Sequence, residues 1–115
     1  MEFVKKSKAK KFKSVPSTTV WEYEMKDEEI NGAIAKINGR YPEKGRVVNE
    51  ESKELVFVLE GKGRLVIEGK EIQFQKGDFL LILPGERYFW QGKMKIFMAN
   101  TPKWKPDQHK FVNSL

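Results

Sequence analysis

The chain has 115 residues, of which 39% are hydrophobic and 33% charged, with no cysteine and a formal net charge of +6 at neutral pH. This length predicts one domain with its own core, and the lack of cysteine excludes disulfides, thiolate zinc sites and a cysteine nucleophile. No apolar run approaches the roughly 20 residues of a membrane-spanning helix, and residues 1–15 lack the apolar segment of a secretory signal. These observations favour a cytoplasmic protein that does not contact a membrane.

Most of the net charge lies at the N-terminus. Residues 1–13 hold six lysines and one glutamate, whereas the remaining 16 basic and 15 acidic residues nearly cancel. We therefore divide the chain into a basic N-terminal arm, residues 1–15, and a folded domain, residues 16–115. Such an arm is typical of a solvated leader or a protected edge strand. Binding of nucleic acid or another polyanion through the arm stays open as an alternative function, although a nucleic-acid reader usually presents a basic face with interleaved aromatic residues.

Apolar residues then recur with a period of two, which indicates β-strands. Residues 18–25 alternate, and residues 55–59 and 79–83 are continuous apolar runs, as expected for strands covered on both sides. Many short strands separated by glycine predict an all-β barrel or sandwich. The proline-containing tail, from about residue 101, is expected to lie across the barrel rather than within a sheet.

Glycine residues mark the expected turns. Glu68-Gly69 separates two short strands and predicts a two-residue hairpin. A glycine turn is expected after Glu60, and Gly92-Lys93 is expected to join two further strands.

Two spacings carry a resemblance to a known family. Glu54 enters an apolar strand and is separated from Gly61 by six residues, and further along the chain Gly77 is followed by Pro84 and Gly85. This order resembles the two motifs of the cupin family over roughly residues 33–100. The resemblance implies an all-β, single-domain, cupin-type jelly-roll barrel, also called a double-stranded β-helix.

The histidines that bind metal in this family are absent. No histidine occupies residues 47–50, where the His-x-His pair of the first motif would fall, and Tyr88 stands in place of the histidine of the second motif. Of the family's ligands only Glu54 remains. An oxygen set of Glu50, Glu54, Asn49 and Tyr88 would suit only a hard ion, so we expect neither a metal nor another cofactor.

The resemblance places Glu54 on a strand face that lines the barrel. Strand alternation puts Trp90 on the same face as Tyr88. We therefore expect a ligand-binding pocket with Glu54 and Tyr88 as polar contacts and with Glu50, Asn49 and Trp90 around them. Two other interpretations stay open: Glu54 is solvated at the barrel mouth or tied to tyrosine, and the aromatic side chains fill the barrel for packing alone.

The favoured function is a metal-free barrel that binds a small polar molecule such as a sugar or sugar derivative. A metal-independent sugar isomerase or epimerase is an alternative, in which Glu54 and Tyr88 are the candidate catalytic residues. The lack of histidine on any predicted barrel strand weighs against an enzyme, and the only histidine, His109, is expected on the surface of the tail. A homodimer is expected, with residues 17–23 at its interface or at the sheet edge.

Overall fold

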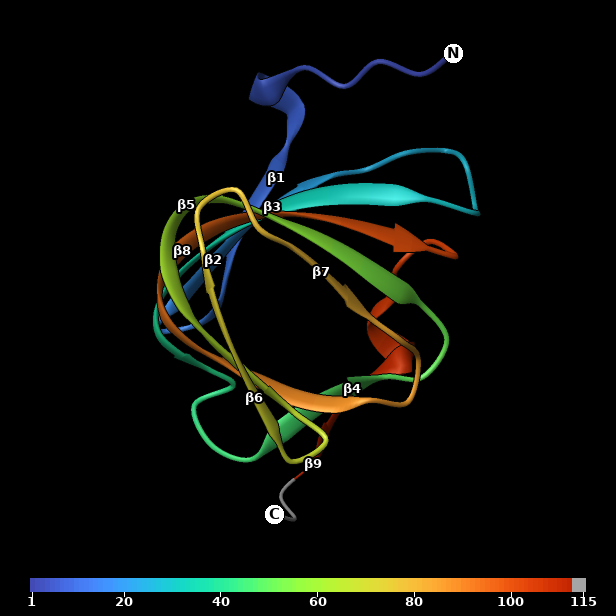
Figure 1. Cartoon of the computed structure of the whole chain (residues 1–115). Coiled ribbons are helices and arrows are strands. Elements are labelled where there is room, and N and C mark those ends of the chain that lie inside the picture. Colours follow the sequence, from blue (N-terminus) through green and yellow to red (C-terminus); the bar gives the residue numbers. More distant parts are fainter. Residues whose placement is uncertain (113–115) are drawn as a thin grey trace.

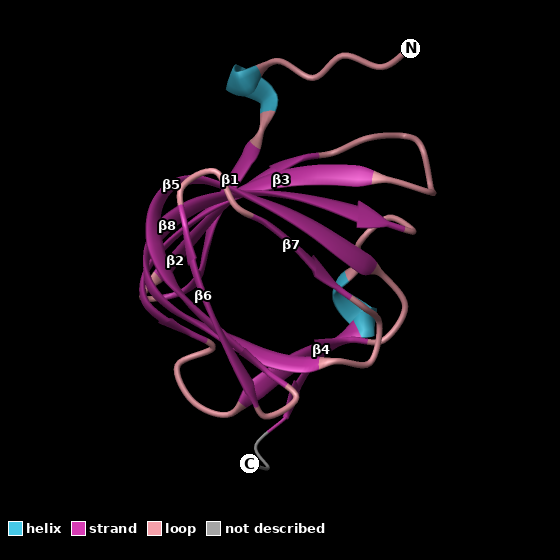
Figure 2. Ribbon diagram, viewed as in Figure 1, coloured by secondary structure: helices cyan, strands magenta, loops and turns pink. Residues whose placement is uncertain are grey.

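A computed structural model describes residues 1–112 of the chain (Figure 1). The described part consists of strands that curl around one interior, with two short 3-10 helical turns (Figure 2). The elements are, in chain order, η1 (Lys6–Lys8), β1 (Lys10–Val15), β2 (Thr18–Tyr23), β3 (Asn31–Tyr41), β4 (Arg46–Asn49), β5 (Lys53–Ile67), β6 (Lys70–Gln75), β7 (Phe79–Ile82), β8 (Arg87–Thr101), η2 (Pro106–Gln108) and β9 (His109–Val112). Within residues 1–112 no helix is long and apolar enough to span a membrane.

The strands form one antiparallel sheet in which β8 is central. Strand β8 pairs with β3 along its length, with β5 on its other side and with β4 near its start. Strands β2 and β1 extend the sheet beyond β3, strands β6 and β7 pair with β5, and β9 pairs with β4. The sheet curls on itself (Figure 1), which confirms the predicted all-β jelly-roll barrel.

Two of the predicted turns are bends within continuous strands. Strand β5 runs through Gly61 and Gly63, and β8 runs through Gly92, so the expectation of a strand break at these glycines is wrong. Gly63 and Gly92 face each other across the ladder, and a Cβ on Gly92 would lie only 2.6 Å from the Cα of Gly63. The absence of side chains lets the two long strands approach closely where the sheet bends. The Glu68-Gly69 hairpin, by contrast, is confirmed by positive φ angles of 45° and 79°.

Strand alternation decides which side chains face the barrel interior. On β5, Glu54, Val56 and Val58 are all buried, and on β8, Tyr88 and Trp90 are each only 2% exposed. The period-two pattern of the sequence therefore gives the inner face correctly on both long strands.

The outer face of β5, β7 and β8 is apolar and uncovered in the single chain. Phe79 is 69% exposed, Leu81 54% and Leu55 42%, and Phe97 is also exposed. The strand register places Leu55 beside Leu81, and Phe57 beside both Phe79 and Phe97. The sequence predicted that these runs are covered on both sides, but one chain covers only their inner side. We call this surface, formed by Leu55, Phe57, Phe79, Leu81 and Phe97, the outer apolar face.

The C-terminal tail enters the sheet, so the expectation that it lies outside any sheet is wrong. Strand β9 pairs antiparallel with β4, with His109 opposite Asn49 and Val112 opposite Arg46. Pro106 lies before this strand in the short turn η2 and leaves the ladder uninterrupted.

Part of the predicted arm also joins the sheet. Residues 10–15 form β1, an edge strand that pairs with β2. Exposed Lys10 forms an ion pair with Glu24, with 2.7 Å between Nζ and Oε2, so one of the arm's cations is matched by the domain itself. The basic side chains of an edge strand also discourage pairing with other chains.

Candidate functional site

A cavity of about 90 Å³ lies inside the curled sheet. Its walls come from strands β1, β2, β3, β5, β8 and β9 and from the tail. The polar or partly polar lining residues are Ser14, Thr18, Glu22, Asn31, Tyr41, Glu54, Tyr88, Asn100, Trp104 and His109, and the apolar ones are Phe12, Val20, Ala33, Ala35, Ile37, Trp90, Ile96 and Met98. Two carboxyls, two phenols, an imidazole and two amides therefore surround a small space with an apolar wall.

Glu54 lies deep in this cavity and is only 5% exposed. The amide Nδ2 of Asn100 donates a hydrogen bond to its Oε1 at 3.1 Å. Burial raises the pKa of the Glu54 carboxyl, and the hydrogen bonds from Asn100 and Asn49 oppose that rise. The side chain is therefore not solvated at the barrel mouth, and its proton is held more tightly than that of an exposed glutamate.

Tyr88 is the second buried polar residue that the sequence predicted for the pocket. Its hydroxyl accepts a long hydrogen bond of 3.4 Å from Nδ2 of Asn49. Burial, and after it the nearby Glu54 charge, raises the pKa of the Tyr88 phenol well above 10. The phenol is therefore neutral at physiological pH, and its own proton is available to a ligand. Trp90 packs edge-on against Tyr88, with 6.4 Å between ring centroids, and lines the same cavity.

His109 lies in the cavity wall rather than on the surface, which corrects the expectation from sequence. Its Nε2 lies 2.9 Å from the hydroxyl of Tyr41, and its Nδ1 lies 2.6 Å from Oδ1 of Asn49. The rings of Tyr41, Trp104 and Phe111 pack around the imidazole. Burial lowers the pKa of His109 to about 4, so the ring is neutral near pH 7.

Asn49 and Glu50, the other two predicted pocket residues, have different positions. Asn49 is 1% exposed and does not line the cavity; it lies behind the wall and bonds to Tyr88, Trp104, Gln108 and His109. Glu50 is exposed, and only its backbone N–H, bonded to the Gln108 carbonyl, takes part in this region. The chain therefore brings Glu54, Tyr88 and Trp90 together and leaves the Glu50 carboxylate outside.

Sequence reasoning missed Tyr41 and Asn100, although the pattern contained a signal for both. Every second residue of β3 from Asn31 to Ile37 is buried, and the same alternation on β8 leads from Tyr88 to Asn100. Reading each as one long strand would have placed Tyr41 and Asn100 on the inner face. His109 had no such signal, because its position depends on the distant pairing of β9 with β4.

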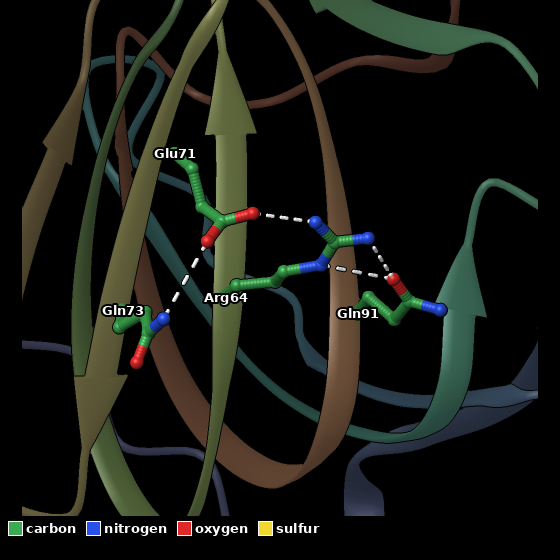
Figure 3. Close-up of polar contacts among 4 residues, drawn as sticks. All are labelled: Arg64, Glu71, Gln73 and Gln91. Carbon is green, nitrogen blue, oxygen red and sulfur yellow. Dashed lines mark hydrogen bonds and ion pairs between the residues drawn. The ribbon is translucent and has the colours of Figure 1, made fainter.

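A second cluster of polar side chains lies on the barrel surface. Arg64 on β5 bonds to Glu71 on β6 and to Gln91 on β8, and Gln73 bonds to the same glutamate (Figure 3). Arg64 and Glu71 are both exposed to a large degree. This cluster links three strands across the sheet, and nothing in its geometry points to a reacting group.

The fold and the cavity together define a jelly-roll barrel whose interior offers oxygen and nitrogen hydrogen-bonding groups. Among residues 1–112, no three or more histidine, cysteine, aspartate or glutamate side chains lie close enough together to hold a metal ion. A family model described as the EutQ-like cupin domain matches residues 39–99, more than half of the chain. The chain belongs to this cupin family.

Solved structures of similar shape have low sequence identity to this chain. Streptomyces PAC13, solved as a variant with uridine, is 13% identical, with a TM-score of 0.87 over 97% of this chain and 91% of that chain. The polyketide cyclase RemF from Streptomyces resistomycificus is 17% identical, with a TM-score of 0.74 over 100% of this chain and 86% of that one. KdgF from Halomonas sp. is 12% identical, with a TM-score of 0.72 over 92% and 98%.

At these identities the likeness concerns the fold alone. PAC13 is described as a nucleoside dehydratase, so this fold hosts enzymes as well as binding sites. No curated protein sequence matches this chain.

Proposed function

We propose that this cupin domain binds a small polar organic molecule, such as a sugar or a sugar derivative, in the barrel cavity without a metal ion. Glu54 and Tyr88 are its polar contacts, and Trp90 forms the wall against which the ligand packs. Asn49 acts from behind the wall by holding Tyr88 and His109 in place.

The observation that carries this proposal is the placement of the Glu54 carboxyl and two phenols around one cavity. A buried carboxyl group costs free energy unless it is hydrogen-bonded, and the hydrogen bonds from the Asn100 and Asn49 amides leave part of the capacity of Glu54 free. The proton of the Tyr88 hydroxyl is likewise available, as described above. A ligand with hydroxyl groups can donate a hydrogen bond to the Glu54 carboxyl and accept one from the Tyr88 hydroxyl. The uridine bound to PAC13, a molecule that contains a sugar, supports a ligand of this type.

Ligand-observed NMR with a panel of sugars, polyols and nucleosides tests the proposal. For the compounds that bind, we expect Glu54→Gln and Tyr88→Phe each to weaken the affinity about tenfold, the effect of losing roughly one hydrogen bond to a buried group. Glu60→Gln, an exposed glutamate on the same strand, is the matched control and leaves the affinity unchanged. Failure of every compound to bind, together with no small molecule in native mass spectra of the purified protein, would contradict the proposal.

A second candidate function, a metal-independent isomerase or epimerase, gains support from one observation. The cavity holds a neutral imidazole, His109, in contact with the phenol of Tyr41. The sequence weighed against an enzyme because it placed no histidine in the barrel. Acid–base catalysis requires a base and an acid within reach of one substrate, and the pair of Tyr41 and His109 supplies a proton acceptor that was not expected in the barrel.

We also propose that the protein is a homodimer, formed through the outer apolar face. The continuous apolar runs at residues 55–59 and 79–83 are typical of strands covered on both sides, yet one chain leaves Phe79 and Leu81 exposed. A second copy of the chain covers such a face by symmetric packing. This location differs from the expected interface at residues 17–23, which contain all of β2, a strand that lies between β1 and β3.

A further inference from the structure

Four side chains form a hydrogen-bond chain whose direction is fixed at one end. The indole Nε1 of Trp104 lies 3.2 Å from one terminal atom of the Asn49 amide. An indole N–H can only donate, so this terminal atom is the oxygen, Oδ1. The contacts of Gln108 support the same assignment. Its Oε1 accepts hydrogen bonds from the backbone N–H groups of Glu51 and Ser52, so the other terminal atom of its amide is Nε2. This Nε2 donates to the same Asn49 oxygen at 3.3 Å.

The Asn49 oxygen in turn fixes the tautomer of His109. An amide oxygen only accepts, so Nδ1 of His109, 2.6 Å away, carries the proton. The imidazole is neutral at pH 7, so its Nε2 holds a lone pair and accepts the hydroxyl proton of Tyr41 at 2.9 Å. The proton of Tyr41 is thus directed at the histidine, and its oxygen, which also accepts a hydrogen bond from Ser14, lines the cavity with one remaining lone pair.

We propose that Tyr41 and His109, with Glu54 in the same cavity, form a proton-transfer site that interconverts small hydroxy-aldehydes and hydroxy-ketones. This inference rests on the proposed function, since the same cavity must first bind a small polar molecule. Tyr41 is the catalytic base that touches the substrate, Glu54 is the catalytic acid, and His109 is a positioning residue that acts through Tyr41.

The reaction balances without an oxidant or reductant. Tyr41 takes the proton from the carbon next to the substrate carbonyl while its own proton passes to Nε2 of His109. The C–H electron pair forms the double bond of an enediol, and the carbonyl oxygen receives the proton of Glu54. In the second half the histidine proton returns through Tyr41 to the neighbouring carbon, and Glu54 recovers a proton from the other enediol hydroxyl. Aldehyde and ketone are thereby exchanged, and all three side chains return to their starting states.

The environment of the two groups suits these roles. Burial keeps the Glu54 carboxyl protonated to a higher pH than usual, and it keeps His109 unprotonated down to about pH 4. Burial thus favours the uncharged form of both groups, so that Glu54 holds its proton more tightly than an exposed glutamate and His109 keeps the lone pair on Nε2. Glu54 and Tyr41 both line the same cavity, which is the geometry that the two roles require.

The size of the cavity limits the substrate. Its volume of about 90 Å³ is smaller than the ~150 Å³ cavity that admits benzene. The smallest hydroxy-carbonyl compounds, of three or four carbons, are therefore the substrates to test. The apolar side chains of Ala33, Ala35 and Ile96 line part of the rest of it.

Deuterium uptake into D-glyceraldehyde and dihydroxyacetone, followed by proton NMR in heavy water, tests the inference. The wild-type protein is expected to speed both deuterium uptake and interconversion of the two compounds. Tyr41→Phe should lower the rate at least about 100-fold, the lower end of what a general acid–base group contributes. Tyr23→Phe is the matched control, since Tyr23 does not line the cavity, and it keeps the full rate.

His109→Gln supplies a readout that a purely structural role would not move. The rate of deuterium uptake with wild type should fall as the pH drops towards 4, because a protonated Nε2 no longer accepts the Tyr41 proton. His109→Gln should be slower than wild type at pH 7, and its rate should not fall further as the pH drops towards 4. Circular dichroism confirms that each variant is folded. Suppose that saturation transfer shows the compounds binding to wild type, but the protein does not speed deuterium uptake into them. That result overturns the inference and leaves the proposed function standing. If no compound of the panel of sugars, polyols and nucleosides binds, both the inference and the proposed function are overturned.

Discussion

Tyr41 and His109 lie 68 positions apart in the chain, and 2.9 Å separates the phenol oxygen of the one from Nε2 of the other. Tyr41 ends β3, and His109 begins β9, the last strand of the described chain. The cavity is therefore complete only when the tail pairs with β4. This dependence on a long-range contact makes the site testable through the residues that hold the tail in place.

Replacement of Asn49 by alanine should destabilise the fold. The change leaves three donors, on Trp104, Gln108 and His109, without their common acceptor in a buried region. Each unsatisfied buried group costs about 1–3 kcal/mol, so we expect a loss of about 3 kcal/mol in the free energy of unfolding, measured by urea denaturation. Asn38→Ala, at an exposed position of β3, should change it by less than about 0.5 kcal/mol. Equal stability of the two variants would show that the Asn49 network does not form.

The pH dependence of stability should report the burial of His109. Its pKa is about 4 in the folded protein and near 6.5 in an unfolded chain, so the unfolded state binds more protons between these values. When the pH is lowered from 7 to 4, the free energy of unfolding of wild type should therefore fall relative to that of His109→Gln. At about 1.4 kcal/mol per pH unit the reduction amounts to about 3 kcal/mol.

Glu54 acts in the opposite direction, and the comparison removes its effect. Its folded pKa is raised, so acidification from that value towards its unfolded pKa stabilises the native state. Both proteins contain Glu54, and the difference between their stability curves isolates the histidine. Urea denaturation at a series of pH values gives both curves. Parallel curves between pH 7 and 4 would mean that His109 is solvated.

Glycine at position 63 should be required for the close approach of β5 and β8 at the bend of the sheet. A Cβ there would lie 2.5 Å from the Gln91 carbonyl oxygen and 2.6 Å from Cε of Met94. Since a backbone atom cannot move aside as a side chain does, Gly63→Ala should cost about 3 kcal/mol, the upper end for overpacking. Gly69→Ala meets nothing within 4 Å and strains only a positive φ of 79°, so its cost should be about 1 kcal/mol. Thermal unfolding of both variants compares them, and a milder effect at Gly63 than at Gly69 would argue against the close approach.

The outer apolar face should control oligomeric state. We expect wild type to elute with the mass of two chains in light scattering coupled to size exclusion, and Phe79→Glu to give the mass of one. A buried carboxylate at the centre of an apolar interface is strongly unfavourable. Ile72→Glu, at an exposed position on β6 outside this face, should remain dimeric. A monomeric wild-type protein, or a dimer unaffected by Phe79→Glu, would remove the proposed interface.

The strands and the hairpin at Glu68-Gly69 were predictable because they depend on local chemistry, whereas the jelly-roll barrel and the inward direction of Glu54 were implied by the resemblance to the cupin motifs. Period-two alternation and turn residues act within a few positions of the chain. The same local reading failed at Gly61 and Gly92, since glycine serves equally as a turn residue and as a bend within a strand. The sequence gives no local signal that separates the two uses.

The candidate site was only half predictable. Glu54, Tyr88 and Trp90 follow from motif position and strand alternation. Tyr41 required the full length of β3 to be recognised, and His109 required the pairing of β9 with β4, a contact that no nearby residue pattern encodes. The lone histidine was consequently placed on the surface, although Trp104 and Gln108 beside it share its buried network.

The central claim is that the cavity holds a neutral His109 with its proton on Nδ1 and its Nε2 bonded to Tyr41. His109 is the only histidine in the chain, so nitrogen-15 NMR of histidine-labelled protein at pH 7 reads it without assignment. The account predicts a protonated Nδ1, an unprotonated Nε2, and a change in the Nε2 signal in Tyr41→Phe. A proton on Nε2, or the averaged signals of an imidazole exchanging with water, would contradict it.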